Sequence, residues 1–140
     1  MKYNNKGFTL IELLIVLAII GVLSSFILAN LIGAKSRARD GQRKSDLRQI
    51  QAAFELYRAD QNGYPLSLPG CGSSLTNGAG GTIYMQKMPC DPLTHTSYIY
   101  TQTGAGYTLS ACLENTNDSQ KDSTNVCATA GTWSYTVTNP

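Results

Sequence analysis

The feature that most constrains this chain is a long apolar run near its N-terminus. Within residues 8–32, Glu12 is the single charged side chain. About 25 residues extend roughly 37 Å as an α-helix, which exceeds the roughly 30 Å hydrocarbon core of a bilayer. A secretory signal peptide has a shorter apolar stretch, of about 7–15 residues, before its cleavage site. The run therefore predicts a membrane-spanning helix rather than a removable signal.

The remaining residues of the 140-residue chain are polar and suffice for one small domain. We divide the chain into a short basic leader (1–7), a transmembrane helix (8–33), an amphipathic stem helix (34–62) and a loop-rich head (63–140). The stem repeats apolar side chains at steps of three and four residues: Leu47, Ile50, Phe54 and Tyr57. This stripe predicts one helix face packed on a sheet.

The head changes to a period of two. Residues 98–101, 107–113 and 133–138 alternate and are rich in Tyr, Thr and Val, which predicts strands, with a hairpin turn at residues 104–106. Residues 65–97 are expected to be mostly loop, and Gly63 is expected to cap the helix in a left-handed conformation. The fold class is therefore α+β, with a long helix packed on a small antiparallel sheet of three or four strands.

Four cysteines, all in the head, indicate an oxidising compartment. They are even in number and form no CxxC pair, and His95 is the only histidine, which disfavours a zinc site. This observation places the head outside the cytoplasm, although counting basic residues on the two sides of the span favours the opposite orientation. Of the three possible pairings we prefer the sequence neighbours, Cys71–Cys90 and Cys112–Cys127, but sequence does not fix the connectivity.

A basic segment follows the apolar run. Residues 35–48 carry six basic side chains and only two acidic ones, and the head beyond them is mildly acidic. We expect these basic residues to lie near lipid headgroups or to pair with acids of adjacent subunits. Nucleic acid binding is the less favoured use of such a segment, and we expect no nucleic acid partner.

The most specific motif is residues 6–12, Lys-Gly-Phe-Thr-Leu-Ile-Glu. It resembles the processing site of type IV prepilins and of the pseudopilins of type II secretion. The resemblance implies that a membrane-embedded prepilin peptidase cleaves between Gly7 and Phe8 and N-methylates Phe8. It also implies a homo-oligomeric helical filament, built by pilus assembly machinery from subunits parked in the inner membrane.

Glu12 needs a partner inside the apolar run, since an acidic residue near a bilayer centre costs about 2.5–3.5 kcal/mol on insertion scales. After cleavage the nearby cations are the amine of Phe8 and the amine of a neighbouring subunit. The family resemblance implies that the intersubunit pair sets the register during assembly. The alternative is that Glu12 lies near the headgroups and is solvated.

We therefore predict a pilin that is first a single-pass membrane precursor with its head outside and then part of an extracellular filament. The alternative is a major-pseudopilin-like subunit of a type II secretion system. A second alternative, of another class, is a membrane-anchored binding module that never polymerises and keeps its leader. No constellation of side chains supports an enzyme. The cysteine-rich head and a poor match to the calcium loop of major pseudopilins favour the pilus.

Two departures from the family bear on the structure. Major pseudopilins bind calcium in a loop before the last strand, where this chain offers Asn115, Asn117, Asp118 and Asp122 at a different spacing, so we expect a solvated loop and no cofactor. Many family members have a proline near the position of Ala29. Its absence predicts a helix that stays continuous or loosens around residues 30–33.

Overall fold

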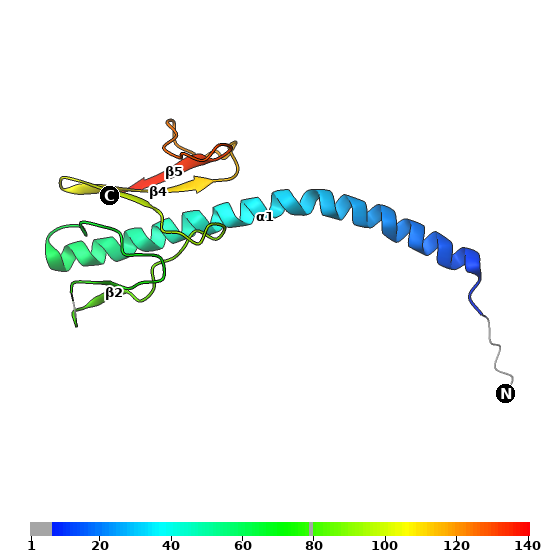
Figure 1. Ribbon diagram of the computed structural model, residues 1–140, viewed down its shortest axis with the longest axis horizontal. Coiled ribbons are helices and arrows are strands. Elements are labelled where there is room, and N and C mark those ends of the chain that lie inside the picture. Colours follow the sequence, from blue (N-terminus) through cyan, green and yellow to red (C-terminus); the bar gives the residue numbers. More distant parts are fainter. Residues whose placement is uncertain (1–6, 79) are drawn as a thin grey trace. The chain divides into compact units, whose positions relative to one another are not determined.

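The computed structural model describes residues 7–78 and 80–140, apart from the side chains of residues 28–30 and 32. Most of the predicted leader therefore lies outside the described residues. Within these residues the elements are one helix and five strands: α1 (Leu10–Gln61), β1 (Leu75–Thr76), β2 (Ile83–Met85), β3 (Ile99–Thr103), β4 (Gly106–Leu113) and β5 (Trp133–Thr138) (Figure 1). The chain divides into two compact units, which meet at residues 35 and 36.

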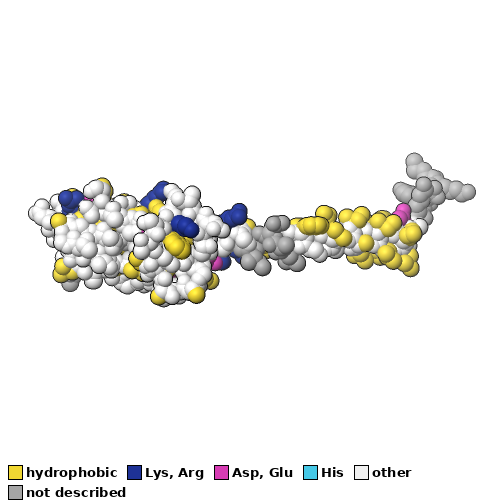
Figure 2. All heavy atoms as spheres, turned by 90° about the horizontal axis from the view of Figure 1, so that it is seen from above, with side chains coloured by type: hydrophobic (Ala, Val, Ile, Leu, Met, Phe, Trp, Pro, Cys, Tyr) yellow, Lys and Arg dark blue, Asp and Glu magenta, His cyan; other side chains and the backbone are white. Residues whose placement is uncertain are grey.

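The first unit is the apolar half of α1. Its segment Leu10–Ile27 is long and apolar enough to cross a membrane, with a mean hydropathy of 2.7, and none of it is buried within the subunit. Hydrophobic side chains cover this part of the helix in Figure 2. Residues 30–33 are helical. The helix is therefore continuous through this region, which is one of the two alternatives expected there.

The second unit begins at Ser36 and contains the stem. At the far end of the stem, α1 ends one residue before a residue with a left-handed backbone conformation. That residue is Asn62, with a φ of 54°, and its N–H donates to the Arg58 carbonyl at 2.9 Å. The prediction that Gly63 supplies the left-handed cap is therefore wrong by one position. Asn tolerates this conformation better than other non-glycine residues, because its short polar side chain can bond locally.

The head contains a three-stranded antiparallel sheet in the order β3-β4-β5. β3 and β4 form a hairpin around Gly104, which has a φ of 56°, and the pairing runs from Ile99 opposite Ser110 to Thr103 opposite Gly106. This sheet confirms the predicted α+β class, and the predicted strands agree with it to within two residues. A small hairpin of β1 and β2 lies in the stretch that we expected to be loop.

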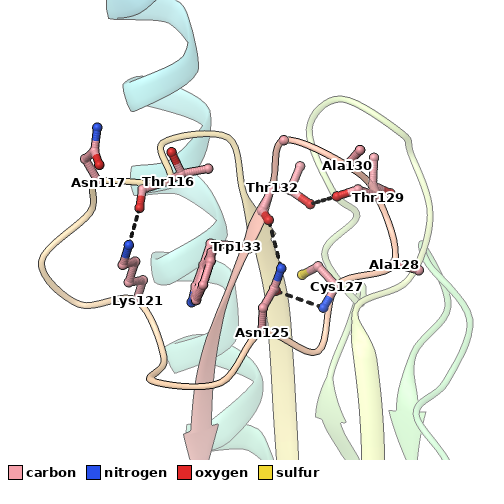
Figure 3. A pocket seen from close by; sticks show the side chains of 11 residues that line it. Thr116, Asn117, Lys121, Asn125, Cys127, Ala128, Thr129, Ala130, Thr132 and Trp133 are labelled. Atoms are coloured by element: carbon pink, nitrogen blue, oxygen red, sulfur yellow. Dashed lines mark hydrogen bonds between the residues drawn. The ribbon is translucent and has the colours of Figure 1, made fainter.

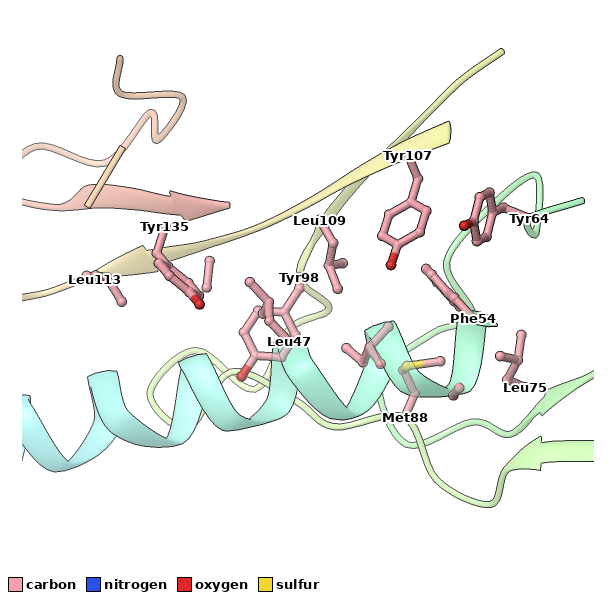
Figure 4. Close-up of a cluster of buried hydrophobic side chains, with 13 residues drawn as sticks. Leu47, Phe54, Tyr64, Leu75, Met88, Tyr98, Tyr107, Leu109, Leu113 and Tyr135 are labelled. Atoms are coloured by element: carbon pink, nitrogen blue, oxygen red, sulfur yellow. The ribbon is translucent and has the colours of Figure 1, made fainter. Parts of the chain in front are cut away.

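The core lies between the stem and the sheet (Figure 4). Leu47, Ile50 and Phe54 of the predicted stripe are completely buried. The Phe54 ring meets the ring of Tyr107 edge-on, with centroids 5.1 Å apart. Burying a side chain of this size contributes about 1.5–3 kcal/mol, so the stripe is what holds the stem to the sheet.

Candidate functional site

The predicted processing site lies at the exposed start of α1. Phe8 is 84% exposed, and a side chain added at Gly7 would meet no atom within 4 Å. The bond between the two residues is therefore accessible in the described part of the subunit, which is a condition for cleavage by a peptidase.

Thr9 and Glu12 form a capping box at the first turn of α1. The Glu12 carboxylate oxygen Oε2 accepts from the Thr9 N–H at 2.9 Å and from the Thr9 hydroxyl at 2.7 Å, while the Glu12 N–H donates to Thr9 Oγ1 at 3.3 Å. A Thr followed three residues later by Glu is the sequence signature of this motif. Sequence reasoning singled out Glu12 but missed Thr9, although that signal was available.

The capping box gives the Glu12 carboxylate partners within its own helix. Both partners belong to Thr9, which remains in the chain if cleavage occurs after Gly7. Local hydrogen bonds reduce the cost of placing a carboxylate in an apolar medium. The Glu12 carboxylate therefore has hydrogen-bond partners that do not depend on another chain.

Two disulfides close loops of the head. They join Cys71 to Cys90 and Cys112 to Cys127, over sequence separations of 19 and 15 residues. These are the neighbouring pairs that we preferred from the sequence. Each bridge ends beside an acidic residue: Asp91 follows Cys90, and Glu114 lies two residues after Cys112. The bridges therefore fix the backbone on which these two carboxylates are carried.

Arg43 of the stem is buried and binds three carboxylates. Its Nε and Nη2 donate to the two oxygens of Asp91 at 2.7 and 3.1 Å, and its Nη1 donates to Asp40 and to Glu114 at 2.8 Å each. The Arg43 side chain is only 2% exposed. We call these four residues the Arg43 cluster; it joins the stem to the segment after Cys90 and to the end of β4.

Asp40 completes the cluster from the stem side. Its two oxygens accept the backbone N–H groups of Glu114 and Asn115, each at 2.9 Å. Arg39, which directly precedes Asp40 and lies one turn before Arg43, forms a bidentate pair with Glu114 at 2.7 and 2.5 Å. The charged groups are therefore paired and hydrogen-bonded, which is the condition under which buried charges are tolerated.

The cluster changes the acidity of Asp91 and Glu114. Burial alone would raise the pKa of Asp91, but hydrogen bonds from Arg43 and from the N–H groups of Thr94 and Leu93 outweigh it and lower that pKa to about 2. The hydrogen bond from Arg39 is the main cause that lowers the pKa of Glu114, also to about 2. Both carboxylates are therefore charged throughout the neutral range.

These contacts correct the expectation for the basic segment. Three basic side chains of this segment pair with acids of the same chain's head: Arg39, Arg43 and Lys44. They therefore do not need lipid headgroups or a second chain as partners. Sequence could not reveal this, since the partners lie 48 to 75 positions further along the chain.

Two acids of the loop between β4 and β5 are bonded within the head, although most of the loop is exposed. Asp118 accepts from Lys44 Nζ at 2.6 Å, and the two oxygens of Asp122 accept from the N–H and the hydroxyl of Thr136 at 3.0 and 2.7 Å. Lys121 Nζ lies 4.5 Å from the centre of the Trp133 ring, beside an open hollow of about 530 Å³ (Figure 3). Most of the loop is therefore exposed as expected, but Asp118 and Asp122 are hydrogen-bonded within the head.

Comparisons with known proteins give two family matches. Residues 2–28 match the prokaryotic N-terminal methylation motif, and residues 30–129 match type II secretion system (T2SS), protein G. The second match covers well over half of the chain. The chain belongs to the type II secretion protein G family.

Individual members of the protein G family are similar to this chain over about two thirds of its length. The type II secretion system core protein G of Pectobacterium carotovorum is 33% identical over 100 residues, covering 64% of this chain and 63% of that protein. The proteins of the same description from Escherichia coli and Vibrio cholerae are each 32% identical and are covered over 67% and 69% of their lengths. The matched region thus spans about two thirds of these relatives, and no solved structure matches.

Membership of the protein G family favours the pseudopilin alternative over the surface pilus that we preferred from the sequence. That preference rested on the cysteines and on the poor calcium loop. Both features concern how loops of the head are held together, and neither involves the helix by which subunits would pack. They therefore carry no information about the kind of filament.

The resemblance to major pseudopilins implies calcium binding in the loop before the last strand. Whether this loop fits calcium depends on the oxygen donors that it offers. The described residues contain no group of three or more His, Cys, Asp or Glu side chains placed to hold a metal ion. Calcium usually takes six to eight oxygen ligands, several from carboxylates. Because Asp118 is paired with Lys44 and Asp122 is bonded to Thr136, the donors do not fit a calcium site.

Proposed function

We propose that this chain is a structural pseudopilin: a subunit that polymerises into the helical pseudopilus of a type II secretion system. The observation that carries the proposal is the protein G family match over residues 30–129, joined to a methylation motif over residues 2–28. A filament subunit needs a membrane segment, a processing site and a folded head, and the two matches together span all three.

The proposed division of the chain follows its chemistry. Residues 1–7 are the leader that a prepilin peptidase removes, and residues 8–33 anchor the precursor in the inner membrane and later pack in the filament. Residues 34–62 form the stem, and residues 63–140 form the head, which lies outside the cytoplasm because it carries two disulfides.

Filament packing would bury the same apolar surface that lipid covers in the precursor. Phe8, Leu10 and Phe26 are each more than two thirds exposed in the isolated subunit. A helix that leaves lipid for a bundle of identical helices exchanges one apolar environment for another, so extraction is nearly neutral in hydrophobic free energy. An added attraction then decides assembly, and we propose that it is the pairing of Glu12 with the Phe8 amine of a neighbouring subunit.

The test expresses the full chain in a host that lacks its own major pseudopilin. We expect mass spectrometry to find a chain beginning at N-methylated Phe8, with both disulfides formed, and we expect secretion to be restored. Glu12→Gln should be processed normally, because the amide oxygen can still accept the bonds from Thr9, yet should fail to restore secretion.

Two outcomes would favour the alternative functions. Processed protein abundant in fibres sheared from the cell surface at native expression, with secretion unaffected by its loss, would favour a surface pilus. A chain that keeps Met1 and works without cleavage would favour the membrane-anchored binding module and would overturn both filament functions.

A further inference from the structure

The loop of residues 114–132 is fastened to the stem by a lysine. Lys44 Nζ donates to Asp118 Oδ1 at 2.6 Å and to Gln120 Oε1 at 3.0 Å. The two charged side chains are only 16% and 17% exposed. A carboxylate and an amide oxygen, both suitable ligands for a hard cation, thus converge on an ammonium group of the chain itself.

A second lysine closes the loop on its outer side. Lys121 Nζ donates to the Thr116 carbonyl at 2.5 Å and stands over the Trp133 ring (Figure 3). The Trp133 N–H in turn donates to the Asp122 carbonyl at 2.7 Å. The ring faces a cation and the loop backbone at once, so its environment reports on whether the loop is in place.

We propose that the ammonium groups of Lys44 and Lys121 supply the positive charge that orders this loop, so that the head folds and stays folded without bound calcium. A calcium ion would have to displace Lys44 from Asp118 and Thr136 from Asp122 before it gained their carboxylates. An ammonium group offers three donors and is always part of the chain, so it carries no cost of association. The inference concerns contacts within one subunit and does not depend on the filament.

Trp133 is the only tryptophan of the chain, which gives the experiment its readout. The full chain, in detergent micelles with its disulfides intact, is heated with EGTA or with about 5 mM CaCl2, a concentration that saturates extracellular sites of ordinary affinity. We expect the tryptophan fluorescence to give the same Tm in both within about 1 °C, since a saturated site would raise it by more. A clear rise of Tm with calcium, or saturable calcium binding in calorimetry, would overturn the proposal.

Variants test the lysine directly. Lys44→Met should lower the Tm by several degrees, in the range of about 4–8 °C that a loss of one ordinary charge-assisted contact produces in a domain of this size. Asp118→Asn should have a similar effect, and the double variant should be little worse than either, because both remove one contact.

Lys87→Met is the matched control, because Lys87 is exposed and lies outside the loop. It should leave the Tm unchanged. An unchanged Tm in Lys44→Met would also overturn the proposal. If Lys44→Met fails to fold, the calcium comparison on the unaltered chain still decides.

Discussion

At the scale of single residues, Arg43 makes the largest set of charged contacts described above, with three carboxylates. It is buried, and Arg43→Met would leave Asp40 and Asp91 without their ion-pair partner, whereas Glu114 keeps its pair with Arg39. Breaking a buried ion pair by removing one partner costs about 3–5 kcal/mol. We expect a loss of that size in urea unfolding of the full chain, whereas Arg48→Met, on an exposed position of the same helix, should change little. A loss below about 1 kcal/mol for Arg43→Met would contradict this account.

The same cluster sets how stability responds to acid. The pKa values of Asp91 and Glu114 are about 2 in the folded head, below their ordinary values of 3.8 and 4.5. An acid with a lowered pKa stabilises the fold above its ordinary pKa and loses that contribution as the pH falls towards the folded value. Urea midpoints should therefore be level above about pH 5 and should fall steeply between about pH 4.5 and 2.

The Asp91→Asn variant is the check on that assignment. It removes one of the two titrating groups, so the acid-side slope should become shallower while the overall stability drops. Burial raises the pKa of Asp46, which works in the opposite sense and reduces the slope without reversing it. Stability that rises on acidification below pH 4 would show that the assignment is wrong.

Two buried tyrosines make a matched pair of tests. The Tyr107 hydroxyl is buried and has no hydrogen-bond partner among the described residues, whereas the Tyr98 hydroxyl donates to the buried Asp46 at 2.6 Å. Leaving a buried group without its partner costs about 1–3 kcal/mol, but removing an unpaired hydroxyl costs nothing in hydrogen bonding. Tyr107→Phe should therefore be neutral or stabilising in thermal unfolding, and Tyr98→Phe destabilising. The reverse order would contradict the hydrogen-bond assignment.

At the scale of elements, each disulfide constrains the backbone near one acid of the Arg43 cluster. Cys71–Cys90 lies next to Asp91, and Cys112–Cys127 lies near Glu114. Closing a loop of about 15 residues contributes about 3 kcal/mol in the chain-entropy model. The pair Cys112→Ser and Cys127→Ser should speed hydrogen exchange in the loop before β5. The pair Cys71→Ser and Cys90→Ser should do so around Asp91. Exchange that rises equally over the whole head in both variants would show that the bridges act globally instead.

The elements also show which parts of the fold could be predicted from the sequence. The stem stripe and the three main strands were predictable, because period and residue type are local signals that packing reinforced. The β1–β2 hairpin was missed because its strands have two and three residues, too short to display a period. The shift of the helix cap to Asn62 was missed because Gly63 is the more common choice at such a position.

The candidate site also contains some contacts that the sequence could reveal and others that it could not. The Thr9–Glu12 capping box could have been read from its spacing, which is local. The Arg43 cluster could not, since its acids come from segments that only the folded sheet and the disulfides bring to the stem. Charge counts along the chain predicted basic residues near lipid headgroups or paired with acids of adjacent subunits, but three of these side chains pair with acids of the same chain.

At the scale of the whole molecule, processing should be separable from folding. The site at Gly7 has open space around it, so Gly7→Leu should leave the thermal unfolding of the head unchanged. The same change replaces the residue after which the proposed cleavage occurs. We expect an intact mass that still includes residues 1–7, together with normal membrane insertion and no restored secretion.

The retained leader gives a physical reason for that loss. It keeps Lys2 and Lys6 at the end of the apolar helix, and it replaces the free amine of Phe8 by an amide that cannot pair with Glu12 as a cation. Thr9→Ser is the control, because its hydroxyl preserves the capping box and leaves the cleavage bond unaltered. It should be cleaved and should support secretion. Secretion by an uncut Gly7→Leu chain would mean that the amine of Phe8 is not needed, and the pairing proposed for assembly would have to be abandoned.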